Sequence, residues 1–282
     1  MFRGCFVLIA LSVIVAELLC GSWAEAHELW VEVPAQGELN SPQTVLFCWG
    51  HGGHRETGEM LLKHEQKLSA WLLEPGGRRQ PLELSRGSDS FRAGFTPEVA
   101  GDYRVDARIE VGILTKEFHG FAPKTRIVML GAACLRAARE VHVKQAQSSP
   151  APGLQIVGVS DLAEVHVGDL VTAQIQLDAK PIGGGDVVVT LGTCGPVSPA
   201  NPQAVAEWTI EENADPRSGK VTFPIIAPGL HTFLVRYTDP RPGVYEGDLQ
   251  FETEYSRLGR GDTYDRTLYV STLTFSVKQK SD

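Results

Sequence analysis

Positive charge is scarce in this sequence of 282 residues. The chain carries 26 Lys and Arg residues against 34 Asp and Glu residues, so its formal net charge is −8. Without a basic excess the protein has no electrostatic basis for binding nucleic acid, and a mildly acidic surface attracts cations instead. The hydrophobic fraction of 43% is ample for the packed core of a globular protein.

Long apolar runs are also lacking, apart from one at the start of the chain. A basic residue precedes an almost wholly apolar run over residues 5–16, and small residues follow at Ala24 and Ala26. This pattern predicts a signal peptide, residues 1–26, with cleavage after Ala24 as the alternative. The run is too short for a comfortable membrane span. We therefore expect a periplasmic or secreted bacterial protein that begins at His27 and has no stable membrane span.

Cysteine is too rare to organise the fold. Beyond the predicted leader only Cys48, Cys134 and Cys194 remain, an odd number at wide spacing. That spacing fits neither a disulfide framework nor a thiolate metal site. Cys48 lies within an apolar run and is expected to be a small buried residue. A single disulfide between Cys134 and Cys194 stays open.

Catalytic signatures are absent as well. The serines occur in no G-x-S-x-G elbow, and no Cys/His pair has a recognisable nucleophile setting. The three glycines at 183–185 lack the lysine and the following helix of a phosphate loop. Acidic residues between positions 239 and 254 follow no calcium-loop spacing. We therefore predict a binding protein rather than an enzyme.

Alternation of apolar and polar residues is the strongest pattern that is present. In residues 103–111, Tyr103 and every second residue after it are apolar, and the residues between them are charged. This period of two is typical of a half-buried antiparallel strand, and it recurs in residues 171–178, 231–237 and 273–277. Only residues 127–145 look helical.

Strands of this kind, separated by Gly, Pro and Asp turns, predict an all-β protein. The length favours two immunoglobulin-like or carboxypeptidase-regulatory-like β-sandwich modules joined by a short helical connector. A weak repeat supports two similar modules, because Gly101 and Gly229 each precede an alternating strand. Aligning these glycines puts His231 where Tyr103 stands, which favours a structural role for His231. The expected division is 1–26 signal peptide, 27–125 first sandwich with a histidine-rich tip, 126–152 connector and linker, and 153–282 second sandwich.

Several histidines are expected to meet at one end of the first sandwich. Two strands, 28–33 and 44–49, should run antiparallel. His27, which precedes the first strand, and His51, which follows the second, then lie at the same end. His54 occupies the glycine-rich turn beside them, where the backbone bends freely.

This arrangement predicts a metal site. After cleavage, the α-amine and the imidazole of His27 can chelate one ion together, and His51 and His54 would add further nitrogens. Nitrogen ligands suit nickel, cobalt, copper or zinc rather than calcium or magnesium. His64, on the connection that leaves the same end, and Glu59 are weaker candidates. The alternative is a solvated polar turn without a ligand.

The same residues carry a resemblance to a known family. The start AHELWVEV and the turn GHGGHRETGE resemble uncharacterised periplasmic proteins whose members are described as periplasmic components of nickel or cobalt uptake. AGDYRVDARIEVG is similar to the late strand of that family's first module, and residues 154–189 to the opening of its second module. The resemblance implies a nickel- or cobalt-binding accessory of uptake, with a membrane transporter component as its partner. His27 and His51 match the family pattern, whereas His54 stands where an apolar or aromatic residue is usual.

Together these patterns predict an exported protein that binds a divalent transition metal without turnover. Two alternatives stay open. One is an envelope binding or structural module that contacts a protein or glycan partner. The other is a copper enzyme in which His27 and a second histidine form an N-terminal brace.

Overall fold

The fold is all-β, as the alternating runs predict. The computed structural model describes residues 27–51, 54–55, 63–138, 152–194 and 209–280. Within these ranges the chain forms strands and one short 3-10 turn, η1 (Glu65–Lys67), and contains no α-helix. The described part of the chain therefore also has no helix long and apolar enough to cross a membrane.

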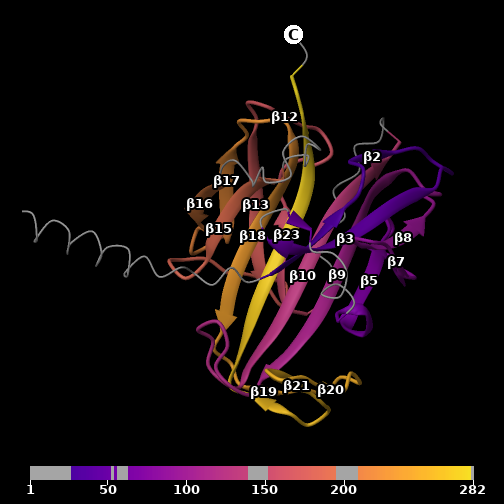
Figure 1. The fold of residues 1–282 in the computed structure, drawn as a ribbon. Helices are drawn as coiled ribbons and strands as arrows, with labels where there is room; N and C mark the ends of the chain where they lie inside the picture. Colours follow the sequence, from indigo (N-terminus) through magenta and orange to yellow (C-terminus); the bar gives the residue numbers. More distant parts are fainter. Residues whose placement is uncertain (1–26, 52–53, 56–62, 139–151, 195–208, 281–282) are drawn as a thin grey trace, which may run out of the picture.

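A large sheet forms the middle of the molecule (Figure 1). Its strands lie side by side in the order β16 (Thr209–Asn213), β15 (Val188–Cys194), β18 (Gly229–Asp239), β23 (Arg266–Lys278), β10 (Thr125–Ala137), β9 (Gly101–Leu114), β21 (Ser256–Leu258) and β20 (Phe251–Glu252). Four further strands pair with it: β5 (Leu68–Leu73), β6 (Arg79–Pro81), β2 (Gln36–Gly37) and β12 (Val165–His166).

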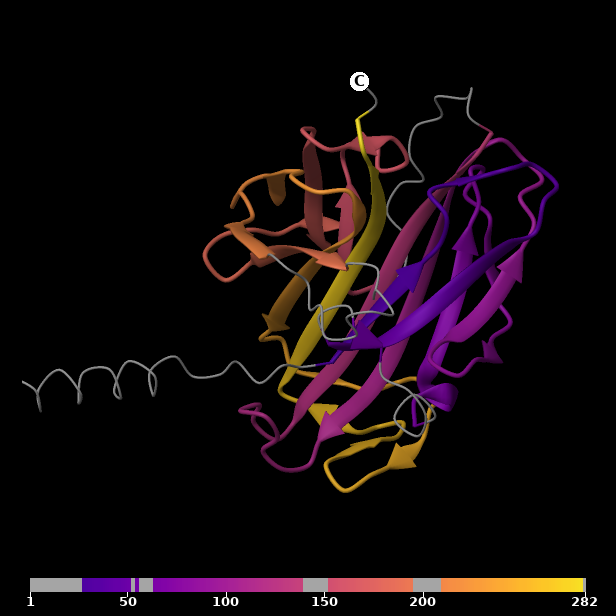
Figure 2. The ribbon, with the colours of Figure 1, turned by 45° about the horizontal axis from the view of Figure 1, so that its top comes forward.

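A smaller sheet covers each face of the large one. The first comprises β1 (Glu28–Glu32), β3 (Gln43–His51), β8 (Phe91–Phe95) and β7 (Ser85–Arg86), with β4 (His54–Arg55) paired to β3. The second comprises β11 (Leu154–Gly158), β13 (Leu170–Leu177), β14 (Lys180–Pro181) and β17 (Lys220–Pro224). In Figure 2 these two sheets lie to either side of the yellow strand β23. A separate hairpin-like pair, β19 (Gly243–Val244) and β22 (Thr263–Tyr264), lies at one end.

Strand β10 separates two hydrophobic cores. Because successive side chains of a strand point to opposite faces, Met129 and Leu135 pack into the core beneath the first small sheet. Leu130 and Ala132 instead contact the core beneath the second small sheet. The two cores are thus distinct, although they share the strands that lie between them.

The expectation of two separate sandwiches is wrong in this respect. β10 pairs in parallel with β23, from Thr125 opposite Arg266 to Ala133 opposite Thr274. One sheet therefore continues from the first half of the chain into the second. The exact boundaries 27–125, 126–152 and 153–282 stay a prediction.

The expected helix is also wrong over residues 127–137, which belong to β10. Both faces of this strand are buried, so its sequence lacks the polar–apolar alternation that identifies a half-exposed strand. Its small residues serve close packing, because a Cβ on Gly131 would lie 3.1 Å from the carbonyl oxygen of Leu29. The rest of the predicted connector, residues 139–151, lies outside the described residues, as does the predicted leader.

The internal repeat has a structural counterpart. The hydroxyl of Tyr103 donates to the Val99 carbonyl at 2.8 Å and accepts from the Val99 amide at 3.0 Å. At the matching position in the second half, His231 is fully buried, and its Nδ1 lies 3.2 Å from the Gly229 carbonyl. Each ring contacts the backbone a few residues earlier in the chain, at or just before the start of its long strand, which supports the structural role predicted for His231.

The disulfide considered between Cys134 and Cys194 is not formed in this structure, because Cys134 is a free thiol. Cys134 lies on β10 and Cys194 on β15, with β23 and β18 between them. Three strand spacings of about 4.8 Å exceed the Cα separation of about 7 Å that a disulfide spans. Cys48 is buried, as its apolar surroundings predict.

Candidate metal site at the histidine tip

The strand register brings three histidine positions to one level. β1 and β3 pair antiparallel, with Glu28 opposite Gly50, so the next pair outward in this register is His27 and His51. β4 pairs with the other edge of β3, and there His51 lies opposite His54. Directly opposite residues of an antiparallel pair have Cβ atoms about 5 Å apart. The backbone therefore lines up His27, His51 and His54 across three neighbouring strands, and we call this end the histidine tip.

Trp49 links the histidine tip to His64. The centroid of its ring lies 5.3 Å from that of His27, with the two rings stacked, and 4.0 Å from that of His64. His64 immediately precedes η1 and is only 8% exposed. The sequence pattern placed His64 among the weaker candidates, whereas the structure brings it onto the same tryptophan as His27.

The His64 ring has a polar atom without a partner in the described part of the chain. Its Nδ1 is buried and has no hydrogen-bond partner there, and the same is true of Nε1 of Trp49. Burial, reinforced by the charges of Lys67 and His27, lowers the pKa of His64 to about 3. The imidazole is therefore neutral at physiological pH, which is the form that ligates metals. A buried nitrogen without a partner is costly unless it is satisfied by water, a ligand or an ion.

A network of ion pairs holds strand β4 in place beside β3. Arg55, the residue after His54, donates to Glu32 on β1 at 2.6 Å and to Asp89 at 2.9 Å. Glu32 also accepts from the Trp30 indole at 2.9 Å. The network joins β4 to β1 across β3 and so holds the two strands that flank His51. No pattern in the sequence indicates Glu32, Arg55 or Asp89, because their pairing depends on how β1, β3 and β4 lie side by side.

The remaining residues to place are Glu59, a weaker ligand candidate, and His231, for which a structural role is expected. Glu59 lies outside the described residues. His231 is in the second core, where it contacts Phe275. Where side chains are described, no three His, Cys, Asp or Glu residues converge on a common point. His51 and His54 are described only through their backbone and strand register.

The fold and the tip define an all-β protein of three stacked sheets with histidines at one end of its N-terminal sheet. The chain belongs to the family described as a domain of unknown function (DUF4198), whose model matches residues 24–239. No curated protein matches the sequence significantly.

Distant likenesses to solved structures add little. Crystal structures of Salmonella alpha-2-macroglobulin, one reacted with methylamine and one a single-site mutant, each share 10% sequence identity with the chain, at TM-scores of 0.27 and 0.28. They cover 87% and 89% of this chain, which spans only 14% and 15% of theirs. Scores this low carry no argument about fold or function.

Proposed function

We propose that this protein binds a divalent transition-metal ion at the histidine tip and acts without turnover. Nickel or cobalt is the proposed ion, with copper and zinc also compatible with nitrogen ligands. His27, through its imidazole and its α-amine after cleavage, and the imidazoles of His51 and His54 are the proposed ligands.

The observation that carries this proposal is the strand register. His27, His51 and His54 occupy one level of β1, β3 and β4, and β4 is itself held by the Arg55 ion pairs. A metal site needs ligands that converge from elements fixed in place, because an ordered ligand set loses less entropy on binding. Three neighbouring strands supply that order.

The surroundings of the tip fit a metal site. The His64 ring, whose Nδ1 has no partner among the described residues, lies beside Trp49, which in turn stacks on His27. His64 would serve as a further ligand, or would receive a hydrogen bond from a water molecule bound to the ion. Imidazole nitrogens of this kind select borderline transition metals over hard cations.

The proposed setting is the bacterial periplasm, reached after removal of residues 1–26. There the protein would capture the ion and pass it to a membrane transporter component as an accessory of nickel or cobalt uptake. The two modules would be immunoglobulin-like or carboxypeptidase-regulatory-like sandwiches, fused through β10 and β23.

Equilibrium dialysis followed by elemental analysis tests the proposal with protein that begins at His27. We expect saturable binding of nickel or cobalt, weakened about 100-fold or more by His51→Ala because a direct ligand is lost. His119→Ala is the matched control, since His119 is an exposed histidine on a different loop. Equal binding by the His51→Ala protein, the His119→Ala protein and the unmodified protein would contradict the proposal.

A further inference from the structure

A second candidate site lies away from the histidine tip, on the opposite face of the large sheet. A cavity of about 220 Å³ opens where the edge of β11 meets β5, β9 and β10. Apolar groups form much of its wall, including Trp71, Leu130, Ala132 and Leu154. The cavity also contacts three arginines, Arg79, Arg104 and Arg108, but only one acidic residue, Asp106. An excess of positive charge here stands out in a chain whose net charge is −8.

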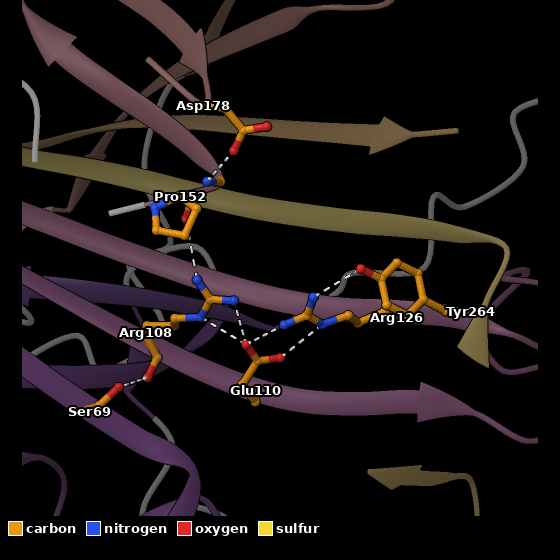
Figure 3. Close-up of polar contacts among 8 residues, drawn as sticks. Ser69, Arg108, Glu110, Arg126, Pro152, Asp178 and Tyr264 are labelled. Carbon is orange, nitrogen blue, oxygen red and sulfur yellow. Dashed lines mark hydrogen bonds and ion pairs between the residues drawn. The ribbon is translucent and has the colours of Figure 1, made fainter. Parts of the chain in front are cut away.

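Part of this charge has a structural explanation. Arg108 binds Glu110 through Nε and Nη2, and its Nη1 donates to the Pro152 carbonyl at 3.3 Å (Figure 3). Arg126 from β10 binds the same Glu110 from the other side. Each nitrogen of the Arg108 guanidinium thus has a partner, and Arg108 fixes the chain just before β11 begins.

Arg104 is only partly engaged. It is 3% exposed, its Nε donates to Asp106 at 2.7 Å, and its Nη1 donates to the Ile156 carbonyl on β11 at 3.2 Å. Its Nη2 has no hydrogen-bond partner within the described residues. This nitrogen is not among the fully buried atoms without a partner, and Arg104 lines the cavity, so an anionic or carbonyl acceptor bound there would satisfy it.

Arg79 has no anionic partner in the described part of the structure. Its guanidinium lies over the Trp71 ring, with Cζ 4.2 Å from the ring centroid. This stacking holds the cation at the mouth of the cavity and leaves its N–H edge for a ligand. Arg79 and Trp71 lie on one face of the sheet. Arg79 is directly opposite Leu73, and Leu73 is two residues from Trp71 along the same strand.

We infer that this cavity binds a small carboxylate with a single apolar ring. Apolar walls would enclose the ring, and Arg79 together with Nη2 of Arg104 would bind the carboxylate. The volume is below the roughly 300 Å³ at which pockets for drug-sized ligands begin, so a one-ring acid is the largest class that fits comfortably.

Calorimetric titration of the full chain with benzoate tests this inference. A chelator is present throughout, so the result does not depend on the metal site. We expect saturable binding at millimolar concentrations or below. Benzamide, which has the same ring without the charge, and acetate, which has the charge without the ring, should each bind about tenfold more weakly.

Two matched variants locate the binding site. Arg79→Gln should weaken benzoate binding about tenfold, since it removes a charge-assisted contact. Arg78→Gln is the control, because Arg78 neighbours Arg79 in sequence but pairs with Glu74 at the surface and does not line this cavity. Urea unfolding verifies that both variants fold. No benzoate binding, equal binding of benzamide, or equal losses in the two variants would overturn the inference.

Discussion

Arg136 offers the sharpest test of how the two halves are held together. It is 5% exposed and makes two contacts with buried Asp102, at 2.7 Å through Nε and 3.2 Å through Nη2. Its Nη1 reaches Asp161, in the second half of the chain, at 2.7 Å. Replacing Arg136 with Met keeps much of the apolar stem and leaves the Asp102 carboxylate buried without a cation.

The expected loss of stability follows from the buried Asp102 charge that is left without a cation. Removing one partner of a buried ion pair typically lowers the free energy of unfolding by about 3–5 kcal/mol. Replacing both partners with apolar residues is often close to neutral. The double variant Arg136→Met with Asp102→Leu should therefore recover most of the loss. Asp161→Asn should cost less than about 1 kcal/mol, because the Asp161 side chain is 41% exposed and its ion pair is screened by solvent.

Urea unfolding at pH 7, followed by circular dichroism, measures each free energy. Arg78→Met is the control, since Arg78 belongs to a solvent-exposed ion pair with Glu74, and it should leave the midpoint unchanged. The reasoning fails if Arg136→Met costs less than about 1 kcal/mol, or if the double variant loses as much as the sum of its two single variants.

Three further outcomes are expected. Tyr103→Phe should lower the free energy of unfolding by about 1–3 kcal/mol in urea, since it deprives both backbone groups of Val99 of a partner; no change would contradict that role. Burial lowers the pKa of His231, so the unfolded chain takes up a proton below about pH 6.5 that the folded ring resists. Stability is then lost as pH falls through that value. Between pH 7.5 and 5 the free energy of unfolding, measured in urea, should fall less for His231→Phe than for the unmodified protein. Parallel plots of this free energy against pH would refute the prediction. Burial also raises the pKa of Cys134 to about 11 and raises that of Cys48. Alkylation of the native protein at pH 8 should leave both thiols unmodified, as measured by mass spectrometry. Rapid modification would contradict this prediction, because it would show that the thiols are accessible.

Local periodicity accounts for what could be predicted of the fold. β9 alternates between the first core and charged residues such as Arg104 and Arg108, so its sequence identifies both the strand and its buried face. β10 has a core on each side, and its apolar and small residues give no such alternation. Its parallel pairing with β23 joins residues about 140 positions apart, and no local pattern indicates that partner.

The candidate site, like the fold, could be predicted from the sequence only in part. Chain direction was enough to bring His27 and His51 to one end, because two antiparallel strands leave little choice. The burial of His64 against Trp49 depends on where η1 packs, which the spacing of histidines does not reveal. The cavity at Arg79 could not be predicted either, since it forms only where β11 crosses the large sheet.

Calorimetric titration of nickel and cobalt into two forms of the protein tests the central claim most directly. One form begins at His27, and the other carries one additional alanine ahead of it, which preserves every side chain but moves the α-amine off the chelate. If the histidine tip binds metal as proposed, the first form binds nickel or cobalt saturably, and the extension weakens binding about tenfold or more, as expected for loss of one nitrogen ligand. Equal affinity of the two forms, or no saturable binding by the first, would contradict the claim.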